Sequence, residues 1–504
     1  MPSTKSNIIA NFAGRSISAL LAIIFAPIYL RYLGVELYGI IGFFASLQAF
    51  LALLDGGISP TLNREAAALS VIPERFQELK DLSRTLEVLC WSLGIAACVI
   101  ALIASPMAAH YWLQSSDIPA QTLSDALMLM SIGFAFQWAT GFYTGGLYGL
   151  EQQKILNAVT VVCAVLRAFG SLIVLAFVSP TLKAFLIWQL IVAVINCLLL
   201  GAIFWRKLPG TEERPRFDLQ LLRRIWRYAA GLTGIGIVSL ILSQTDKVIL
   251  SKLISLEDFG YYSLAITLAG TGIGIIVTSI QTAYFPLFSR LVAQDLMSDL
   301  RATYHHGCQA MSLFVVPIVT VLSFFSYEIL LVWTRNPVVA ERTCGLLALV
   351  GIATGLNGLM HIPYFAQLAF GITKISFWQN VIAIIVLVPL MIFATFRFGA
   401  VGGASCSVLL NLGYVVFGLQ YMHHIILKGE LKKWYVKDVG IPLGAALLLN
   451  AIAYTMFKTI GPTEPSLIKI VLFVGAVFVA TCVITIITLP ELTFPFLKRV
   501  WRYA

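Results

Sequence analysis

The sequence predicts an all-α integral membrane protein. Of its 504 residues, 59% are hydrophobic and only 12% are charged, and the mean hydropathy is +0.89. This composition is far more apolar than that of a soluble domain. The charged residues separate long apolar runs, most of which reach the roughly 20 residues that a membrane-spanning helix needs.

Fourteen such runs follow one another, and each predicts a transmembrane helix. The runs cover residues 8–30, 36–56, 84–113, 123–149, 155–179, 183–205, 228–253, 257–286, 305–333, 343–370, 376–398, 401–427, 438–460 and 467–489. The first run is too long for a cleavable signal peptide and lacks a small-residue cleavage site. We therefore expect it to remain as the first helix.

The basic residues predict the orientation. The net charge is +10, with 34 Lys and Arg. Placing the N-terminus in the cytoplasm assigns most of these residues to cytoplasmic loops, so we expect both termini there. The basic residues punctuate apolar segments and form no soluble patch, which argues against nucleic acid as a partner. The eight cysteines show no metal-ligand spacing, and we expect neither a metal nor a cofactor.

An internal repeat with an offset of 221 residues divides the chain. Three residues that open the second helix have counterparts that open the eighth: Glu36 and Glu257, Tyr38 and Phe259, Gly39 and Gly260. Six helices per unit is an even number, so the two lobes are predicted to be parallel and related by a pseudo-two-fold axis along the membrane normal.

The repeat predicts four regions. Residues 1–205 form the N-terminal six-helix lobe, and residues 206–227 form a cytoplasmic amphipathic linker. Residues 228–427 form the C-terminal six-helix lobe. Residues 428–504 hold two additional transmembrane helices and a cytoplasmic tail. The linker alternates Arg with Leu, Ile and Trp at helical spacing, which is typical of a helix on the membrane surface.

Two charges in the seventh run are the first candidate site. Asp246 and Lys247 lie about 10 Å inside its distal end, where charges are costly and usually functional. Adjacent helical residues point about 100° apart, so we expect each charge to need its own partner, water or substrate. Gln244 shares the face of Lys247, and we interpret both as candidate substrate-binding residues. The alternative is that Lys247 extends to the interface and Asp246 pairs with a neighbouring helix.

Three other apolar runs contain improbable residues. Arg15 shares a helix face with Asn11, Arg167 lies near the centre of the bilayer, and His361 shares a stripe with Asn357. We interpret all five as candidate substrate-binding residues. The alternatives are that Arg15 extends to the interface, that Arg167 forms a structural ion pair, and that His361 is a satisfied core histidine.

The sum of the buried charges indicates an anionic substrate. Arg15, Arg167 and Lys247 face one clearly buried acid, Asp246. Guanidinium groups match phosphate oxygens in bidentate geometry, so such a cavity suits a phosphate-bearing passenger. Asp246 is the candidate for ion coupling. Asp55, beside two glycines at the end of the second run, is a candidate helix-end or gate residue.

Enzyme classes are disfavoured. The sequence has no GxxxxGK[ST] loop for hydrolysing ATP and no acidic cluster typical of a metal-dependent glycosyltransferase. No long outer loop has room for a polymerase site. We therefore expect a transporter and not an enzyme.

Three stretches resemble a known family. They are NIIANFAGRSISALLAIIFAPIYLRYLGVELYGIIGF (7–43), LLDGGISPTLNRE (53–65) and QTDKVILSKLISLEDFGYYSLA (244–265). With the repeat and the charges of the seventh run, they resemble the Wzx-type polysaccharide and O-antigen flippases. These belong to the multidrug/oligosaccharidyl-lipid/polysaccharide flippase superfamily.

The resemblance implies a V-shaped pair of six-helix lobes, with a central cavity lined by helices 1, 2, 7 and 8. It implies translocation of an undecaprenyl-diphosphate-linked oligosaccharide to the outer leaflet of a bacterial inner membrane by alternating access. An ion gradient or the membrane potential would drive the movement, and a polysaccharide polymerase and a chain-length regulator are the implied partners. The alternatives are a cation-coupled multidrug exporter of the same superfamily and a membrane glycosyltransferase or polymerase.

Overall fold

The computed structural model describes residues 4–53, 57–115, 118–210, 213–221, 223, 241, 243–372, 374–460 and 466–489. Within these ranges the chain is helical, and its only β pairing is a single bridge between Gln114 and Ser255. The all-α prediction is therefore confirmed. The chain divides into two compact units, Met1–Gly260 and Tyr261–Ala504, which are described separately.

Among its described residues, the first unit contains long and short α-helices, with a 3-10 turn before α4 and π-helical turns after α4 and α6. These elements are α1 (Thr4–Leu33), α2 (Val35–Leu53), α3 (Ile58–Leu69), η1 (Pro73–Arg75), α4 (Phe76–Met107), η2 (Ala108–Trp112), α5 (Ala120–Gly149), α6 (Gln153–Ile173), η3 (Val174–Val178), α7 (Leu182–Lys207) and a helix over 243–253. Helix α9 (Leu256–Ala293) begins in this unit and continues into the second.

The second unit contains the remaining elements. They are α10 (Met297–Phe324), α11 (Ser326–Thr334), α12 (Pro337–Ala369), α13 (Lys374–Gly413), η4 (Tyr414–Gly418), α14 (Leu419–Ile425), α15 (Leu431–Lys433), η5 (Trp434–Gly440), α16 (Ile441–Ile460) and α17 (Leu467–Thr488).

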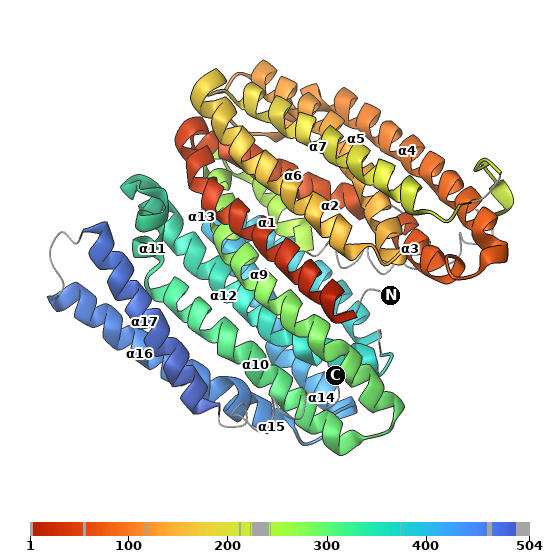
Figure 1. Ribbon diagram of the computed structural model, residues 1–504. Coiled ribbons are helices and arrows are strands. Elements are labelled where there is room, and N and C mark those ends of the chain that lie inside the picture. Colours follow the sequence, from red (N-terminus) through yellow and green to blue (C-terminus); the bar gives the residue numbers. More distant parts are fainter. Residues whose placement is uncertain are drawn as a thin grey trace. The chain divides into compact units, whose positions relative to one another are not determined.

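Helix α5 is the centre of the first unit, where it packs against α3, α4 and α7 (Figure 1). Its Phe142 is fully buried beside Phe204 of α7, with ring centroids 6.0 Å apart. The amphipathic helix α3 buries one face, which includes Leu62 and Ala66, against the same helix. Because lipid is itself apolar, close van der Waals packing of these faces orders the bundle.

Helix α13 consists of two helices that meet at Gly399. This residue has φ of 58° and ψ of −142°, which are not helical. A Cβ on Gly402 would lie 3.1 Å from Thr395 N, and Tyr414 donates a hydrogen bond of 2.9 Å to Asn380 Oδ1. In one straight helix, residues 380 and 414 would be about 50 Å apart. The chain therefore reverses at Gly399, between the predicted runs 376–398 and 401–427.

Helices α16 and α17 run side by side and pack against α10 (Figure 1). Phe325, which follows α10, is fully buried and faces Tyr454 and Phe457 of α16 and Phe473 of α17. These aromatic contacts attach the C-terminal helix pair to the second unit.

Eleven described segments are long and apolar enough to cross a membrane. One of them, residues 376–425, contains the reversal at Gly399, and residues 35–48 form a shorter apolar helix. Most of the predicted seventh run lies outside the described residues. The chain is thus a multi-pass membrane protein, whereas the count of fourteen helices stays a prediction.

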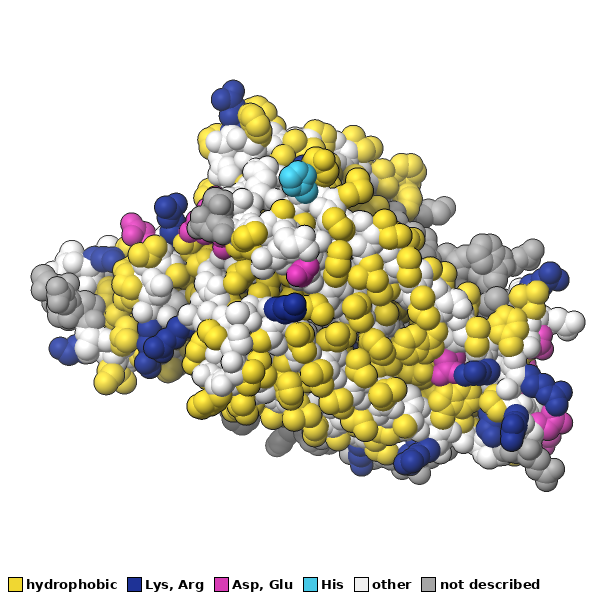
Figure 2. All heavy atoms as spheres, turned by 90° about the horizontal axis from the view of Figure 1, so that it is seen from above, with side chains coloured by type: hydrophobic (Ala, Val, Ile, Leu, Met, Phe, Trp, Pro, Cys, Tyr) yellow, Lys and Arg dark blue, Asp and Glu magenta, His cyan; other side chains and the backbone are white. Residues whose placement is uncertain are grey.

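The surface agrees with that assignment. Hydrophobic side chains cover most of the face shown in Figure 2. Phe177 is 84% exposed and Phe396 is 79% exposed. In water such exposure would be unfavourable, but in a bilayer it places apolar side chains against lipid.

Helix boundaries repeat with the offset found in the sequence. Helix α2 begins at Val35 and α9 at Leu256, and α6 begins at Gln153 and α13 at Lys374. Both pairs are 221 residues apart. The division into lobes at residues 206–227 stays a prediction.

Part of the linker is described. Residues 214–218 have no regular secondary structure and lie along α4, where Arg216 N donates to Asp81 Oδ1 at 2.7 Å and Asp218 N donates to Thr85 Oγ1 at 2.9 Å. A helix begins at residue 219. Residues 224–240 lie outside the described ranges.

Candidate functional site

Asp246 and Lys247 form an ion pair with each other. Lys247 Nζ lies 3.2 Å from Asp246 Oδ1 and donates a hydrogen bond of 3.0 Å to Ser243 O. The side chains are 15% and 20% exposed, respectively. The expectation that these adjacent charges cannot neutralise each other is therefore wrong. The long lysine side chain bends back along the helix and spans the difference in direction.

The end of this helix is attached to η2, which follows α4, and to the residues just after it. Trp112 Nε1 donates to Ser251 Oγ at 3.1 Å, and Lys252 Nζ lies 5.6 Å from the centre of the Trp112 ring. Leu256 N donates to Gln114 O at 2.7 Å. These contacts hold the helix that carries the charged pair. Gln244 is half-buried on the same helix.

Arg167 on α6 is a cation without an acidic neighbour. Its Nε is buried without a hydrogen-bond partner, and the titratable groups near it are Tyr29 of α1 and Cys163. The Tyr29 hydroxyl donates to Ala168 O at 3.3 Å, which places it beside the arginine. Among the described residues no carboxylate pairs with Arg167. A desolvated guanidinium in this setting favours an anionic ligand.

Arg15 and Asn11 lie on α1 but in different surroundings. Arg15 is exposed and forms no ion pair with any described residue. Asn11 Oδ1 accepts a hydrogen bond of 2.6 Å from Asn157 Nδ2 on α6. Gly14 allows this close approach, because a Cβ there would lie 3.1 Å from Asn157 Cβ. Asn11 therefore joins two helices, while Arg15 pairs with no acid among the described residues.

His361 and Asn357 belong to a polar network in the second unit. His361 Nδ1 lies 2.7 Å from Gln281 Oε1 of α9, and its Nε2 lies 3.2 Å from Asn357 Oδ1. Asn357 Nδ2 donates to Asn411 Oδ1 at 2.9 Å. Asn357 is exposed, so the network has polar atoms at a surface. Sequence reasoning missed Gln281 and Asn411, although each is an amide within an apolar run.

Asp55, the predicted gate residue, lies outside the described residues. The candidates in the first unit are Asn11, Arg15, Arg167, Gln244, Asp246 and Lys247. Those in the second are Asn357 and His361. Among these candidates, Asp246 contacts Lys247 and Asn357 contacts His361.

Asp246 is not the only buried acid. Glu87 of α4 is 5% exposed and accepts hydrogen bonds from Tyr143 Oη at 2.6 Å and Trp205 Nε1 at 2.9 Å. Glu328 and Asp438 are 3% and 0% exposed. The expectation of one buried acid is therefore wrong. The expectation fails because helix packing buries carboxylates that lie near the ends of apolar runs.

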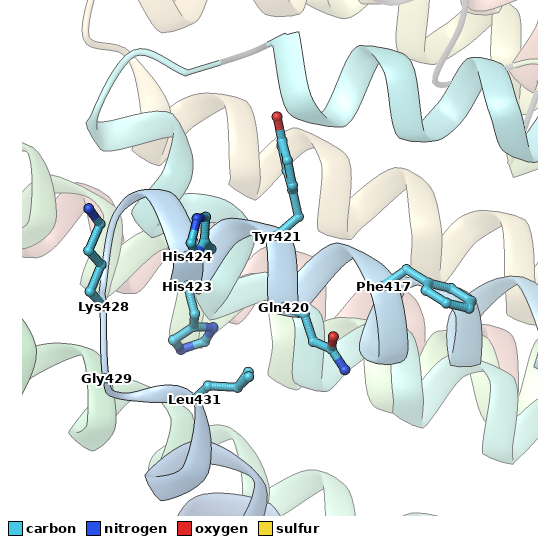
Figure 3. Close-up of a pocket in the computed structure, with 8 residues that line it drawn as sticks. All are labelled: Phe417, Gln420, Tyr421, His423, His424, Lys428, Gly429 and Leu431. Carbon is cyan, nitrogen blue, oxygen red and sulfur yellow. The ribbon is translucent and has the colours of Figure 1, made fainter.

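A cavity of about 640 Å³ lies at the end of α14 (Figure 3). Its lining combines aromatic, amide and basic side chains from η4, α14, the following loop and the start of α15: Phe417, Gln420, Tyr421, His423, His424, Lys428, Gly429 and Leu431. The sequence did not indicate this cavity. Within the described ranges, no three His, Cys, Asp or Glu side chains are grouped so that they could hold a metal ion.

Several solved structures share this fold. The lipid II flippase MurJ in an inward closed conformation is 14% identical, with a TM-score of 0.70 over 95% of this chain and 98% of that chain. A multidrug resistance MATE family transporter of the MOP superfamily is 12% identical, with a TM-score of 0.65 over 84% of this chain and 96% of that one. The helices of this chain are therefore arranged in the fold of these membrane proteins.

Residues 28–335 match the family described as polysaccharide biosynthesis protein, and the chain belongs to that family. A protein of Shigella flexneri named as an O-antigen transporter is 23% identical over 411 residues, which are 80% of this chain and 95% of that protein. The teichuronic acid biosynthesis protein TuaB of Bacillus subtilis (strain 168) is 22% identical over 63% of each chain. The resemblance to the polysaccharide flippases of this superfamily is thus confirmed.

Proposed function

We propose that this protein is a flippase for lipid-linked oligosaccharides. The cargo is an undecaprenyl-diphosphate-linked repeat unit of an O-antigen, capsule or exopolysaccharide, and it moves from the cytoplasmic to the outer leaflet of the bacterial inner membrane by alternating access. The family and the relatives named for O-antigen transport and teichuronic acid biosynthesis support this substrate class.

The surroundings of the Arg167 guanidinium are the main observation that supports the proposal. Its guanidinium has a buried Nε without a hydrogen-bond partner and, among the described residues, no acid beside it. A diphosphate supplies the oxygens that such a group binds in bidentate geometry. The exposed Arg15 offers a second cation from α1. Polar groups such as Asn357, His361 and Gln244 suit the sugar hydroxyls.

Two sources of energy fit this assignment. Outward movement of an anion across an inside-negative membrane is favoured by about 2.3 kcal/mol per charge for each 100 mV. The second source is a cation gradient, for which Asp246 is the proposed coupling acid. Protonation of Asp246 would end its ion pair with Lys247 and free the ammonium group for the diphosphate.

The test is translocation in reconstituted liposomes. The probe is a fluorescent undecaprenyl-diphosphate-linked oligosaccharide, and the variants are Arg167→Ala, Arg167→Lys and Lys247→Ala. We expect Arg167→Ala to slow translocation about tenfold or more, because a charge-assisted hydrogen bond contributes about 1.5–3 kcal/mol. Arg167→Lys should restore part of the rate, since lysine keeps the charge without the bidentate geometry.

Arg75→Ala is the matched control. Arg75 already pairs with Glu78 at 2.7 Å and its side chain is 42% exposed, so its loss should leave the rate unchanged. Wild-type rates in folded Arg167→Ala would show that the arginine is structural. The similarity to multidrug transporters favours one alternative. Failure of the intact protein to move the probe, together with gradient-driven export of a cationic drug, would establish that alternative.

A further inference from the structure

His305 of α10 is held between two carboxylates. Its side chain is 1% exposed, and both ring nitrogens face an acid. Nδ1 lies 2.5 Å from Asp438 Oδ2, on η5, and Nε2 lies 3.0 Å from Glu430 Oε2, just before α15. The Asp438 side chain is 0% exposed and that of Glu430 is 20% exposed. The arrangement joins residues more than 120 positions apart.

This arrangement requires a proton beyond the one that a neutral histidine carries. A neutral imidazole has one N–H and one nitrogen lone pair, and an ionised carboxylate has only acceptor atoms. With both acids ionised and the histidine neutral, one contact would place a lone pair against a carboxylate oxygen. Both contacts are favourable only when the histidine is protonated on both nitrogens or when one acid is protonated.

The neighbouring groups do not remove that requirement. Gln309 donates to Asp438 Oδ1 at 3.0 Å, and Arg301 Nε lies 3.7 Å from Glu430 Oε1, so each acid also has a second favourable neighbour. Tyr304, Cys308 and His423 are the other titratable groups that face the cluster from α10 and α14. None of these three lies between the imidazole and its two acids.

His423, the other histidine near the cluster, contacts different groups. His423 Nδ1 lies 3.0 Å from Leu419 O, so that nitrogen carries a proton, and its Nε2 lies 3.1 Å from the Tyr304 hydroxyl. Neither contact places a carboxylate against the His423 ring. The extra proton that the two carboxylate contacts require is therefore held by His305 or by one of its two acids.

The cavity of Figure 3 lies beside the Glu430 end of the cluster. Lys428, Gly429 and Leu431, which surround Glu430 in the chain, line the open cavity of Figure 3. Glu430 is the most exposed of the three groups, so a proton enters or leaves through it. The positive-inside prediction places this loop on the cytoplasmic side.

We propose that His305, Asp438 and Glu430 form a proton-binding site that ties α10 to the segment 430–440. With the proton bound, both nitrogens hold a carboxylate. When the proton leaves, one contact becomes repulsive and the loop that carries Glu430 separates from α10. Since release follows a rise in pH, the tie is present at low cytoplasmic pH and is lost as the pH rises.

The site is placed to influence transport, a step that rests on the proposed function. A Cβ on Gly307, two residues after His305, would lie 3.0 Å from the Tyr284 ring of α9 and 3.2 Å from Ile362 of α12. Ile362 is next to His361, which contacts Gln281 of α9. Because these helices are closely packed, movement at the start of α10 shifts the polar network on α9 and α12.

Amide hydrogen exchange of the purified full-length protein tests the site without a substrate. Protection factors, corrected for the intrinsic exchange rate, are measured for peptides covering residues 427–440 between about pH 6 and about pH 9. We expect protection in the wild type to fall about tenfold or more as the pH rises, the effect of losing one charge-assisted hydrogen bond.

Glu430→Gln gives an opposite and specific result. A glutamine amide donates to the unprotonated Nε2, so the variant needs no extra proton. It should keep its protection at high pH and exceed the wild type there, which a misfolded variant would not do. Glu328→Gln is the matched control, because Glu328 is a buried acid of the same unit that pairs with Lys458 at 3.2 Å and not with a histidine. It should follow the wild type.

Constant protection in the wild type across this pH range, or a Glu430→Gln profile identical to that of the wild type, would overturn the proposal. Flipping assays at the same pH values test the coupling separately. A pH-dependent tie with a pH-independent flipping rate would refute the coupling and leave the proton site intact. A pH-dependent tie in a protein that flips no lipid-linked sugar would refute the proposed function alone.

Discussion

Gly39 of α2 and Gly260 of α9 lie at a close crossing of these two helices. A Cβ on Gly39 would be 3.1 Å from Gly260 N, and one on Gly260 would be 2.8 Å from Val35 Cγ1. The same Cβ positions would also overlap the carbonyl oxygens of Leu256 and Val35, respectively. The two glycines and these two partners are each 221 residues apart. Equivalent positions of the two repeats therefore contact each other, and each repeat contributes the same positions to the contact.

The crossing predicts that Gly260→Ala destabilises the protein by about 1–3 kcal/mol, because the added methyl overlaps backbone atoms that cannot rotate away. A thermal melt in detergent measures the effect. Gly272→Ala on the same helix is the control, since a Cβ there meets nothing within 4 Å. Equal melting temperatures for the two variants would contradict a tight crossing.

Glu87 is predicted to stabilise the first unit. Besides the bonds from Tyr143 and Trp205, its carboxylate accepts from Arg84 Nη1 at 2.7 Å. Glu87→Gln weakens three charge-assisted hydrogen bonds and should cost about 2–3 kcal/mol. Denaturation of the purified protein checks this value, with the exposed Glu74→Gln as the control. An unchanged midpoint for Glu87→Gln would show that water replaces the lost bonds.

Asn450 is predicted to hold the C-terminal helix pair in place. It is 0% exposed, and its Nδ2 donates to Thr481 Oγ1 of α17 at 3.0 Å and to Thr320 Oγ1 of α10 at 3.4 Å. Asn450→Ala removes these bonds and leaves a cavity, with a cost of about 1–3 kcal/mol.

Hydrogen exchange of α16 and α17 is the measurement for this variant. We expect faster exchange in both helices, whereas Leu448→Ala, at a position 68% exposed, should leave exchange unchanged. If only the global melting temperature fell, with uniform exchange across the chain, Asn450 would have no local role.

Asp246 yields a prediction about coupling. If its protonation frees Lys247, then Asp246→Asn should move the lipid-linked probe at a rate that no longer depends on an imposed pH gradient. Flux in liposomes with and without the gradient measures this. Asp258→Asn, at an exposed position near the start of α9, is the control and should retain the wild-type response. A gradient response preserved in Asp246→Asn would assign coupling to another group.

Elements that depend on local pattern were predictable. Apart from the seventh run, most of which lies outside the described residues, the apolar runs correspond to helices. An apolar stretch of that length has one stable form in lipid, with every backbone group bonded within the helix. The 221-residue repeat anticipated that α2 and α9, and α6 and α13, begin at equivalent positions. Even the reversal at Gly399 falls between two predicted runs.

The partners of the buried charges were not predictable. Sequence spacing suggested that Asp246 and Lys247 point apart, but a flexible lysine side chain joins them at 3.2 Å. The Glu87 site draws its donors from α4, α5 and α7, and His305 meets an acid 133 residues away. Hydropathy and helical periodicity report on one segment at a time, so they cannot show which segments meet.

The sequence by itself determined that this is an all-α membrane protein with a repeated plan and an excess of basic residues, because these properties follow from composition and local order. Only the tertiary structure decided that Arg167 has no acidic partner among the described residues, while Lys247 and His305 do. The physical reason is that the stability of a charge in a low-dielectric interior depends on the atoms within a few ångströms of it. Helix packing brings those atoms from distant parts of the chain.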